Sequence, residues 1–524
     1  MLRDNSIFYP DKAATYFYGA EITFNQLYLK STRLANVLVE QGINKGDRVG
    51  LLLPNCPQFV ISYWAVLMAG AIVVNLNPLY TQDELKYLFA DAQLNGLITY
   101  DAPLPIVKPL CQELNISTVI VTRLSDFMPG GKVSTPEELG LEPGWLHFSQ
   151  LLDTDKIWAP PVMDIQWDDP AVIQYTGGTT GVPKGAVLTQ YNLTAAAMAL
   201  YQWTIDMDER TPVEKRRVLS IVPFFHIYGE ACCICWSALS MSTMVILPRF
   251  DVNEVIDTIN KFDFFLYWPA VPTMLQGIFY SPRVSEIDWH RKICFCGTGA
   301  APATDELIAK CRQYDFNFYE GYGMSETTAL GLSTPGCKTK PMSAGVPYID
   351  IDMRLVNEDG QDVPLGEPGE IWIKGPCVMK EYWNKPEDTA DVFSEDGWLK
   401  SGDIAYMDQD GYVFIVDRTK DMIIAGGFNI YPREVDEVLF KHPKVADAIT
   451  IGVPDEYRGE NVKAFIQLKP GESVTAEEII AFCREHLTAY KVPKLIEFRS
   501  QLPRTNTGKA LRRVLRDEEI KKKN

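Results

Sequence analysis

The segment best equipped for chemistry is a glycine- and threonine-rich loop at residues 175–185, YTGGTTGVPKG. Glycine amides can approach an anion closely, while threonine hydroxyls and the Lys184 ammonium can contact its oxygens. The loop does not fit the Walker pattern, because Lys184 follows Pro183 and precedes Gly185 where a serine or threonine is required. A plain flexible turn seldom needs Gly, Thr and Lys together. We therefore expect a phosphate-binding loop of another type.

Further short motifs follow this loop in a fixed order along the chain. They are VPFFHIYG at 222–229, GTGAAP at 297–302, YEGYGMSET at 319–327, SGD at 401–403, DRTKD at 417–421 and PRTNTGK at 503–509. Together with the loop, they resemble the motifs of the adenylate-forming superfamily, which includes acyl-CoA synthetases, firefly luciferase and peptide-synthetase adenylation domains. The resemblance runs from residue 175, in the middle of the expected large domain, almost to the end of the chain.

The resemblance implies a reaction in two steps. A carboxylate attacks the α-phosphorus of ATP and releases pyrophosphate, and the thiol of coenzyme A then displaces AMP from the acyl-adenylate. Because the first step brings two anions together, cations and Mg²⁺ must supply much of the catalysis. The second step needs no protein nucleophile, so none of the 11 cysteines has to be catalytic.

The resemblance also implies a set of nucleotide contacts. Tyr322 would stack near adenine, Asp403 would accept hydrogen bonds from both ribose hydroxyls, and Lys184 would hold the pyrophosphate end. Without the other motifs, a surface salt bridge would explain Asp403 or Arg418 about equally well. The ATP- or AMP-binding residues expected on this basis are Thr176, Gly177, Gly178, Thr179, Thr180, Gly181, Lys184, Gly299, Ala300, Ala301, Glu320, Gly321, Tyr322, Gly323, Ser325, Asp403, Arg418 and Lys509.

Catalysis is expected from Lys509, Glu326, His226 and Ser325. By resemblance, Lys509 reaches the substrate carboxylate and ATP, Glu326 ligates Mg²⁺, Ser325 touches phosphate, and His226 gates or orients the substrate. The alternatives are a basic face for Lys509, shared with Arg504, Arg512 and Arg513, and a plain core position for His226. Lys420 matches the family's hinge between two domains, and Gly426, Gly427 and Phe428 match its coenzyme A tunnel.

The acyl pocket is expected from residues 226–236, 268–274 and 297–301, with His226, Tyr228, Val271 and Gly297 as its lining. These segments are mostly apolar or small, and Glu230 is the one charged partner they offer. Gly177 in the loop, NPLYT at 77–81 and GGFNIYPREV at 426–435 resemble medium- and long-chain fatty acyl-CoA synthetases. Aryl-CoA ligases of the benzoate or cinnamate type are the runner-up.

Three other classes are less well supported. A luciferase-like enzyme would carry a second catalytic lysine where this chain has Ile424. A carrier-loading adenylation domain would be expected to have a carrier or condensation module after Asn524. A nucleotide-binding regulator without catalysis would be expected to lack Lys509, Glu326 or Asp403, and all three are present.

The elements that must position these residues follow an α/β pattern. Strands are expected at 171–176, 185–188, 218–223, 243–247, 371–374 and 413–417, and helices are expected to begin after Thr189, at Pro432 and at the capping box Thr475-x-x-Glu478. We expect a large N-terminal domain of wrapped sheets over 1–419, which binds ATP and the acid. A small mobile α+β domain over 420–524 would carry the catalytic lysine.

Composition narrows the possible partners. The chain has 524 residues and 46% hydrophobic content, enough for more than one core. Its 50 basic and 68 acidic residues give a formal charge of -18, which disfavours nucleic acid. The cysteines lack a paired framework and predict buried, reduced thiols in a cytoplasmic protein. No secretory signal is visible, and the apolar run at 231–248 predicts a core element, not a span, although peripheral membrane contact stays open. The protein is expected to be a monomer or a homodimer.

Overall fold

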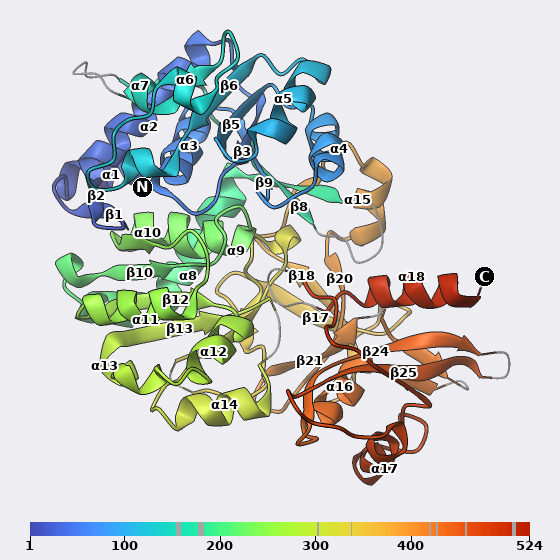
Figure 1. Cartoon of the computed structure of the whole chain (residues 1–524). Helices are drawn as coiled ribbons and strands as arrows, with labels where there is room; N and C mark the ends of the chain where they lie inside the picture. Colours follow the sequence, from blue (N-terminus) through green and yellow to red (C-terminus); the bar gives the residue numbers. More distant parts are fainter. Residues whose placement is uncertain are drawn as a thin grey trace.

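A computed structural model describes residues 1–152, 159–176, 183–300, 303–336, 338–418, 421–425, 428–455, 458–505 and 510–523. The elements up to β21 form a large body, and the orange and red elements after residue 421 form a smaller one beside it (Figure 1). The larger body combines two mostly parallel sheets with a small antiparallel sheet. The predicted α/β fold class, a large N-terminal part with a small α+β C-terminal part, is confirmed.

The first main sheet has the strand order β19-β9-β8-β4-β3-β5-β6-β7. Its central strands are parallel and buried on both faces, as expected for a sheet covered by helices on each side. Helices α4 (Gln82–Ala92) and α5 (Leu104–Glu113) cover one face of this sheet. Helices α2 (Phe24–Glu40), α3 (Pro57–Met68) and α8 (Gln190–Arg210) pack on the other. The strands are β3 (Arg48–Leu52), β4 (Ile72–Asn75), β5 (Gly96–Tyr100), β6 (Thr118–Thr122), β7 (Leu146–His147), β8 (Pro170–Thr176), β9 (Lys184–Thr189) and β19 (Glu381–Tyr382).

The expected phosphate loop joins β8 to β9, which pair antiparallel. Thr176 at the end of β8 lies opposite Lys184 at the start of β9, so the pairing brings both ends of the loop together. Residues 177–182 between them lie outside the described residues. Thr189 caps the following helix α8, as predicted, because its side chain accepts a hydrogen bond from the Asn192 amide.

The second main sheet has the order β16-β15-β14-β13-β12-β10-β11-β1-β2. Its strands β10 to β14 are mutually parallel where they pair in the middle of the sheet, so their carboxyl ends share one edge. That edge is where ligands of open α/β sheets usually bind. The strands are β1 (Ala13–Phe17), β2 (Ala20–Thr23), β10 (Arg217–Ser220), β11 (Thr243–Ile246), β12 (Phe265–Ala270), β13 (Ile293–Thr298), β14 (Tyr319–Tyr322), β15 (Leu332–Ser333) and β16 (Val346–Pro347).

The third sheet is antiparallel and carries SGD on one strand and the start of DRTKD on the next. Its order is β17-β18-β20-β21, and Asp403 is the register partner of Arg418. The strands are β17 (Asp352–Val356), β18 (Gly369–Lys374), β20 (Leu399–Met407) and β21 (Val413–Arg418). Buried residues from all three sheets meet in one large core, and the opposite face of the first sheet packs in a second core, so the sheet edges that carry the motifs are held together.

The smaller body has its own sheet and its own cores. Helices α16 and α17 cover one face of this sheet, and α18 packs on the other. Its strands are β22 (Ile423–Ala425), β23 (Phe428–Ile430), β24 (Val445–Asp455), β25 (Gly459–Leu468) and β26 (Leu495–Phe498). Helix α16 begins at Pro432, and Thr475 with Glu478 forms the predicted capping box of α17. A domain boundary at 419/420 stays a prediction, because both residues lie outside the described ranges.

The helices complete the layers. They are α1 (Leu2–Phe8), α2 (Phe24–Glu40), α3 (Pro57–Met68), α4 (Gln82–Ala92), α5 (Leu104–Glu113), α6 (Pro136–Leu139), α7 (Phe148–Leu152), α8 (Gln190–Arg210), α9 (Ile227–Gly229), α10 (Trp236–Ser240), α11 (Val252–Lys261), α12 (Pro272–Phe279), α13 (Trp289–Lys292), α14 (Asp305–Arg312), α15 (Pro386–Val392), α16 (Pro432–Phe440), α17 (Ala476–His486) and α18 (Arg512–Lys523). A π-helix, η3 (Glu230–Cys235), joins α9 to α10.

Two sequence expectations about burial can be compared with this fold. The apolar run at 231–248 is divided between η3, α10 and β11 and is buried, and no helix in the described part of the chain is long and apolar enough to cross a membrane. The described cysteines are all free thiols, and among them Cys294 alone is exposed. The prediction of buried thiols is wrong for Cys294, because its side chain points off the solvent side of β13.

Candidate active site

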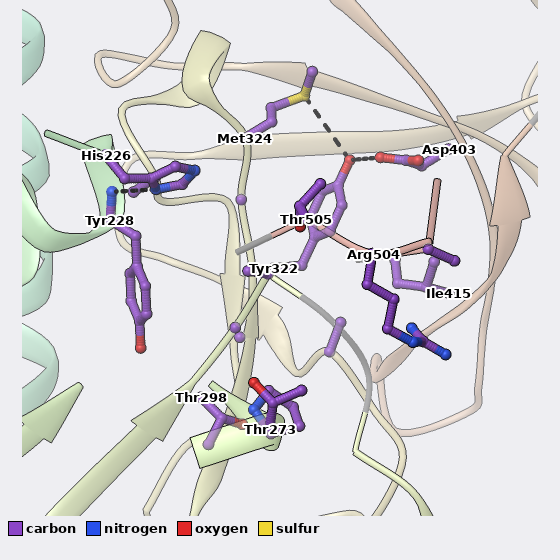
Figure 2. Close-up of a pocket in the computed structure, with 18 of the residues that line it drawn as sticks. His226, Tyr228, Thr273, Thr298, Tyr322, Met324, Asp403, Ile415, Arg504 and Thr505 are labelled. Atoms are coloured by element: carbon purple, nitrogen blue, oxygen red, sulfur yellow. Dashed lines mark hydrogen bonds between the residues drawn. The ribbon is translucent and has the colours of Figure 1, made fainter. Parts of the chain in front are cut away.

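A cavity of about 2210 Å³ opens at the edge where the three sheets of the larger body face the smaller body. Figure 2 shows part of its lining, with His226 and Tyr228 on one side of Tyr322 and Asp403 on the other. The predicted site residues among the lining are Thr176, Lys184, His226, Tyr228, Gly297, Gly299, Ala300, Glu320, Gly321, Tyr322, Gly323, Ser325, Glu326 and Asp403. The sheet edges therefore bring together motifs that are up to 227 residues apart, from Thr176 to Asp403.

The other predicted residues have different outcomes. Val271 is not among the described lining residues, because it is buried in the main core at the N-cap of α12. Those that lie outside the described residues are Gly177, Gly178, Thr179, Thr180, Gly181, Ala301, Lys420, Gly426, Gly427 and Lys509. Arg418 and Phe428 lie in β21 and β23, but their side chains are not described.

Tyr322 and Asp403 contact each other across two sheets. The Tyr322 hydroxyl donates a hydrogen bond to Asp403 Oδ2 at 2.6 Å, and both side chains border the cavity (Figure 2). Asp403 is largely buried, and its backbone amide is held by the Ser401 hydroxyl at 3.0 Å. An ionised carboxylate fixed in this way offers acceptor oxygens to hydroxyl groups of a ligand.

Glu326 lies in a short 3₁₀ turn, η5 (Ser325–Thr327), immediately after β14. Its Oε1 accepts a hydrogen bond from the Tyr382 hydroxyl at 2.7 Å, and its backbone carbonyl accepts one from the Met379 amide at 2.7 Å. Tyr382 also lines the cavity, yet no motif marks it, since it is 56 residues away from Glu326 in the chain. These contacts fix the direction of a carboxylate that is only 7% exposed.

Lys184 projects from the start of β9 and forms an ion pair with Asp388 of α15. Its ammonium also lies 5.3 Å from the centre of the Tyr382 ring. Both members of the ion pair are partly exposed, so solvent screens their attraction and the pair contributes little stability. A more strongly charged anion in the cavity can therefore take the place of Asp388.

Glu320 supports the loops around the cavity through backbone contacts. Its carboxylate accepts hydrogen bonds from the Ala303 amide at 3.2 Å and the Met342 amide at 3.1 Å. Burial raises the pKa of Glu320 to about 7, while these amide hydrogen bonds and the charge of Arg433 act to lower it. Glu320 thus ties the segments after β13 and before β16 to the edge of β14.

The side of the cavity beyond His226 is mostly apolar. His226 caps α9 by accepting a hydrogen bond from the Tyr228 amide at Nδ1. The Tyr228 hydroxyl donates to the Gly297 carbonyl at 3.0 Å and the Ala270 carbonyl at 3.3 Å, so its ring crosses from α9 to β13. The remaining wall here includes Cys232, Tyr267, Phe295, Leu332 and Tyr348. Burial holds the pKa values of Tyr228 and Tyr267 well above the usual range, so both stay neutral.

Comparison with known proteins gives matches over nearly the whole chain. Residues 3–383 match the AMP-binding enzyme family, and residues 434–509 match the AMP-binding enzyme C-terminal domain. The chain belongs to the AMP-binding enzyme family. It is 41% identical to a long-chain-fatty-acid–CoA ligase of Bacillus subtilis, over 99% of this chain and 94% of that protein. It is 35% identical to a feruloyl-CoA synthase of an Amycolatopsis species, over 97% of this chain and 96% of the relative.

Solved AMP-binding enzymes share the fold. ATP-bound MatB from Rhodopseudomonas palustris aligns with a TM-score of 0.87 and 27% identity, over 99% of this chain and 98% of that one. O-succinylbenzoate coenzyme A synthetase (MenE) from Bacillus subtilis, in complex with ATP and magnesium ion, aligns with a TM-score of 0.82 and 28% identity, over 99% and 98%. The adenylate-forming fold predicted from the motifs is thereby confirmed.

The residues of this AMP-binding enzyme fit a magnesium ion that is carried by ATP. Glu326 offers a buried carboxylate on the cavity wall, and carboxylate oxygen is what this hard ion prefers. No group of three or more His, Cys, Asp or Glu side chains converges in the described ranges. Mg²⁺ typically takes one or two carboxylates together with substrate phosphates, so a single glutamate on the cavity wall would be sufficient.

The smaller body of this AMP-binding enzyme also lines the cavity. Arg504, Thr505 and Ala510 border it, and they flank the segment that contains Lys509. Figure 2 shows Arg504 and Thr505 among the lining residues, together with Ile415 and Tyr322. Arg433 of α16 donates a hydrogen bond from Nη1 to the Ile415 carbonyl at 2.6 Å. Arg433 and Thr505 belong to the quoted segments 426–435 and 503–509, but they were not among the expected site residues, because their positions depend on how the two bodies meet.

Proposed function

We propose that this AMP-binding enzyme is an acyl-CoA synthetase that converts a medium- or long-chain fatty acid into its coenzyme A thioester. The observation that carries the proposal is a single cavity that combines a nucleotide side, around Tyr322 and Asp403, with an apolar side, around Tyr228. Such a cavity suits a reaction between ATP and an acid with an apolar tail. The relative named above at 41% identity is a long-chain-fatty-acid–CoA ligase, which supports the fatty acid.

In the first step, the acid's carboxylate attacks the α-phosphorus of ATP and pyrophosphate leaves. Asp403 accepts the ribose hydroxyls, Lys184 exchanges Asp388 for the departing phosphates, and Lys509 neutralises charge between the carboxylate and ATP. The magnesium held by Glu326 supplies charge neutralisation on the phosphates when it is bound. Thr176, Ser325 and the glycines of the loop contribute further phosphate contacts, and His226 orients the carboxylate.

In the second step, coenzyme A attacks the acyl carbonyl of the adenylate and AMP leaves with the bonding electrons. We assign residues 1–419 to an adenylation domain and 420–524 to a mobile domain that turns about Lys420 between the steps. Gly426, Gly427 and Phe428 would then border the path of the pantetheine arm. The mobile domain would remove Lys509 from the adenylate when it turns.

An aryl-CoA ligase is the second candidate. The apolar wall contains Tyr228, Tyr267, Phe295 and Tyr348, whose rings can also stack on an aromatic acid. One of the named relatives is a feruloyl-CoA synthase at 35% identity. We propose a fatty acid in place of an aromatic acid as the substrate because the relative with 41% identity is a long-chain-fatty-acid–CoA ligase.

The test is a panel of acids supplied to the purified protein with ATP, Mg²⁺ and coenzyme A. Saturated fatty acids of increasing length, benzoate, cinnamate and ferulate are compared by pyrophosphate release, AMP release and thioester yield. We expect turnover of medium- or long-chain fatty acids with all three products in equal amounts, and loss of turnover when EDTA removes magnesium. Higher turnover of an aromatic acid would favour the second candidate, and no pyrophosphate from any acid would exclude both.

A further inference from the structure

Glu230 is a buried carboxylate that the proposed chemistry does not use. Its side chain is fully buried at the start of the π-helix η3, four residues after His226. Among the described residues that border the cavity, Glu230 is absent, so the sequence-based view of Glu230 as a charged group facing the acyl pocket is not supported. Its two oxygens instead accept hydrogen bonds from Tyr63 and Asn75.

These contacts begin a chain of hydrogen bonds that crosses between the two main sheets. Asn75 Nδ2, at the end of β4, donates to Glu230 Oε2 at 2.5 Å and to Gln174 Oε1 at 3.0 Å. Gln174 Nε2, in β8, then donates to the Phe225 carbonyl at 3.2 Å. Gln174 lies two residues before Thr176 at the root of the phosphate loop, and Phe225 directly precedes His226.

The direction of each hydrogen bond depends on the acceptor at Glu230. An amide has donors at one end and an acceptor at the other, so two acceptors beside Nδ2 fix the rotation of Asn75. Its Oδ1 is buried without a partner in the described residues, so no contact at Oδ1 competes with the two contacts at Nδ2. If Asn75 turned round, its Oδ1 would face Gln174 Oε1, and Gln174 would have to turn its donor away from Phe225.

We propose that Glu230 is a positioning residue for adenylation, acting through Asn75 and Gln174 to hold the root of the phosphate loop against the segment that carries His226. This inference rests on the proposed acyl-CoA synthetase activity. A π-helical turn at Glu230 supports it, because such turns occur frequently at functional sites. What Glu230 contributes is an acceptor oxygen toward Asn75, and a neutral glutamine can provide the same oxygen.

The proposal predicts different effects for two substitutions of Glu230. Glu230→Gln can accept from Asn75 with Oε1 and donate to the Tyr63 hydroxyl, which then donates to Cys235 Sγ, 3.3 Å away in the present structure. Glu230→Met has a similar length but no acceptor. We expect Glu230→Met to lower kcat for ATP–pyrophosphate exchange at least about tenfold, since small displacements of reacting groups are costly, and Glu230→Gln to stay within about threefold of the wild type.

The readout that a merely structural role would not produce is a difference between the half-reactions. Pyrophosphate has left before coenzyme A attacks, so thioester formation from a supplied acyl-adenylate should stay within about twofold in Glu230→Met. Tyr63→Phe is the matched control, because it also removes one buried hydrogen bond to Glu230 but from the oxygen that does not face Asn75. Tyr63→Phe should lower stability and leave both half-reactions within about twofold.

Asn75→Ala breaks the same chain at its next link and serves if Glu230→Met does not fold. Alone, Asn75→Ala should show the same selective loss of pyrophosphate exchange. Combined with Glu230→Met, it should add almost nothing, because two changes in one chain of contacts are not additive.

Multiplied losses in the double variant, equal loss in both half-reactions, or a Glu230→Gln protein as impaired as Glu230→Met would each overturn the inference. An inactive wild type with every acid would instead overturn the proposed function.

Discussion

Lys509 is expected to act in only one of the two steps. Thr505 and Ala510, which flank the segment that contains Lys509, line the same cavity as Tyr322 and Asp403. Lys509→Ala should lower pyrophosphate exchange about 100-fold or more, as loss of a group that stabilises transition-state charge does, and leave thioester formation from acyl-adenylate largely intact. Both half-reactions are measured on the same preparation.

The control for Lys509 is Arg513→Ala. Arg513 is a partly exposed cation in the basic segment that was the alternative explanation for Lys509. Its removal should leave both half-reactions within about twofold, as expected for a surface charge. If Lys509→Ala slowed both steps equally, a role confined to adenylation would be wrong.

Glu230 should also make stability depend on pH. Burial raises its pKa from 4.5 to about 7 in the folded protein. Between these values the folded state keeps a proton that the unfolded state has released, so the contribution of Glu230 to stability is greatest at low pH and is lost as pH rises through 7. The loss is on the order of 3 kcal/mol.

The measurement compares urea unfolding of the wild type and Glu230→Gln at about pH 5 and about pH 8. The glutamine cannot ionise, so its free energy of unfolding should rise relative to the wild type between the two pH values. Buried acids such as Glu320 and Asp436 have raised pKa values too, but they are present in both proteins and cancel in the difference. A difference that does not change with pH would show that Glu230 titrates as an exposed carboxylate.

At the scale of elements, the sequence predicted those features that are set by residues close together in the chain. The helix caps at Thr189 and Thr475 and the strand on either side of the phosphate loop follow from local patterns, and the structure confirms them. The strand expected at 218–223 is shorter, β10 (Arg217–Ser220), because the chain turns at Pro223 toward α9. The π-helix η3 has no local signal, because residues 231–236 are all apolar and leave no polar face whose shift would reveal an extra residue in the turn.

The difference between local patterns and long-range contacts also explains which cavity residues were not predicted from the sequence. Tyr382, Asn75 and Gln174 line the cavity without belonging to any motif. Asn75 meets Gln174 from 99 residues away, and Tyr382 meets Glu326 from 56 residues away. Such contacts depend on which strands become neighbours in a sheet, and one sequence does not specify that order.

The cap of α17 offers a prediction at this scale. The Thr475 hydroxyl accepts from the Glu478 amide, and the Glu478 carboxylate accepts from the Thr475 amide at 2.8 Å. Thr475→Ala should destabilise the smaller body by about 1 kcal/mol. Hydrogen exchange of the α17 amides should report the loss of stability. Both half-reactions should stay unchanged, because α17 packs against Ile423 of β22 and Val435 of α16, and none of its residues is among the described lining of the cavity. Thr475→Ser, which keeps the hydroxyl, is the control.

At the scale of the whole molecule, Arg433 joins the smaller body to the third sheet. Its guanidinium donates to the Ile415 carbonyl, and its backbone amide donates to Asp417 Oδ2 at 2.6 Å. It also lies near enough to Glu320 for its charge to lower that pKa. Arg504 and Thr505 of the same body border the cavity, so the Arg433 contacts should favour the orientation in which adenylation occurs.

Arg433→Met keeps the apolar stem and removes the guanidinium contact to Ile415. A hydrogen bond from a charged group contributes about 1.5–3 kcal/mol, so its loss should depopulate the adenylation orientation and slow pyrophosphate exchange about tenfold or more. Thioester formation from acyl-adenylate should be unchanged or faster, because it would use the other orientation. Arg499→Met is the matched control, since Arg499 pairs with Glu497 and Glu518 within the smaller body. Equal slowing of both steps by Arg433→Met would mean that the contact supports the fold and does not select an orientation.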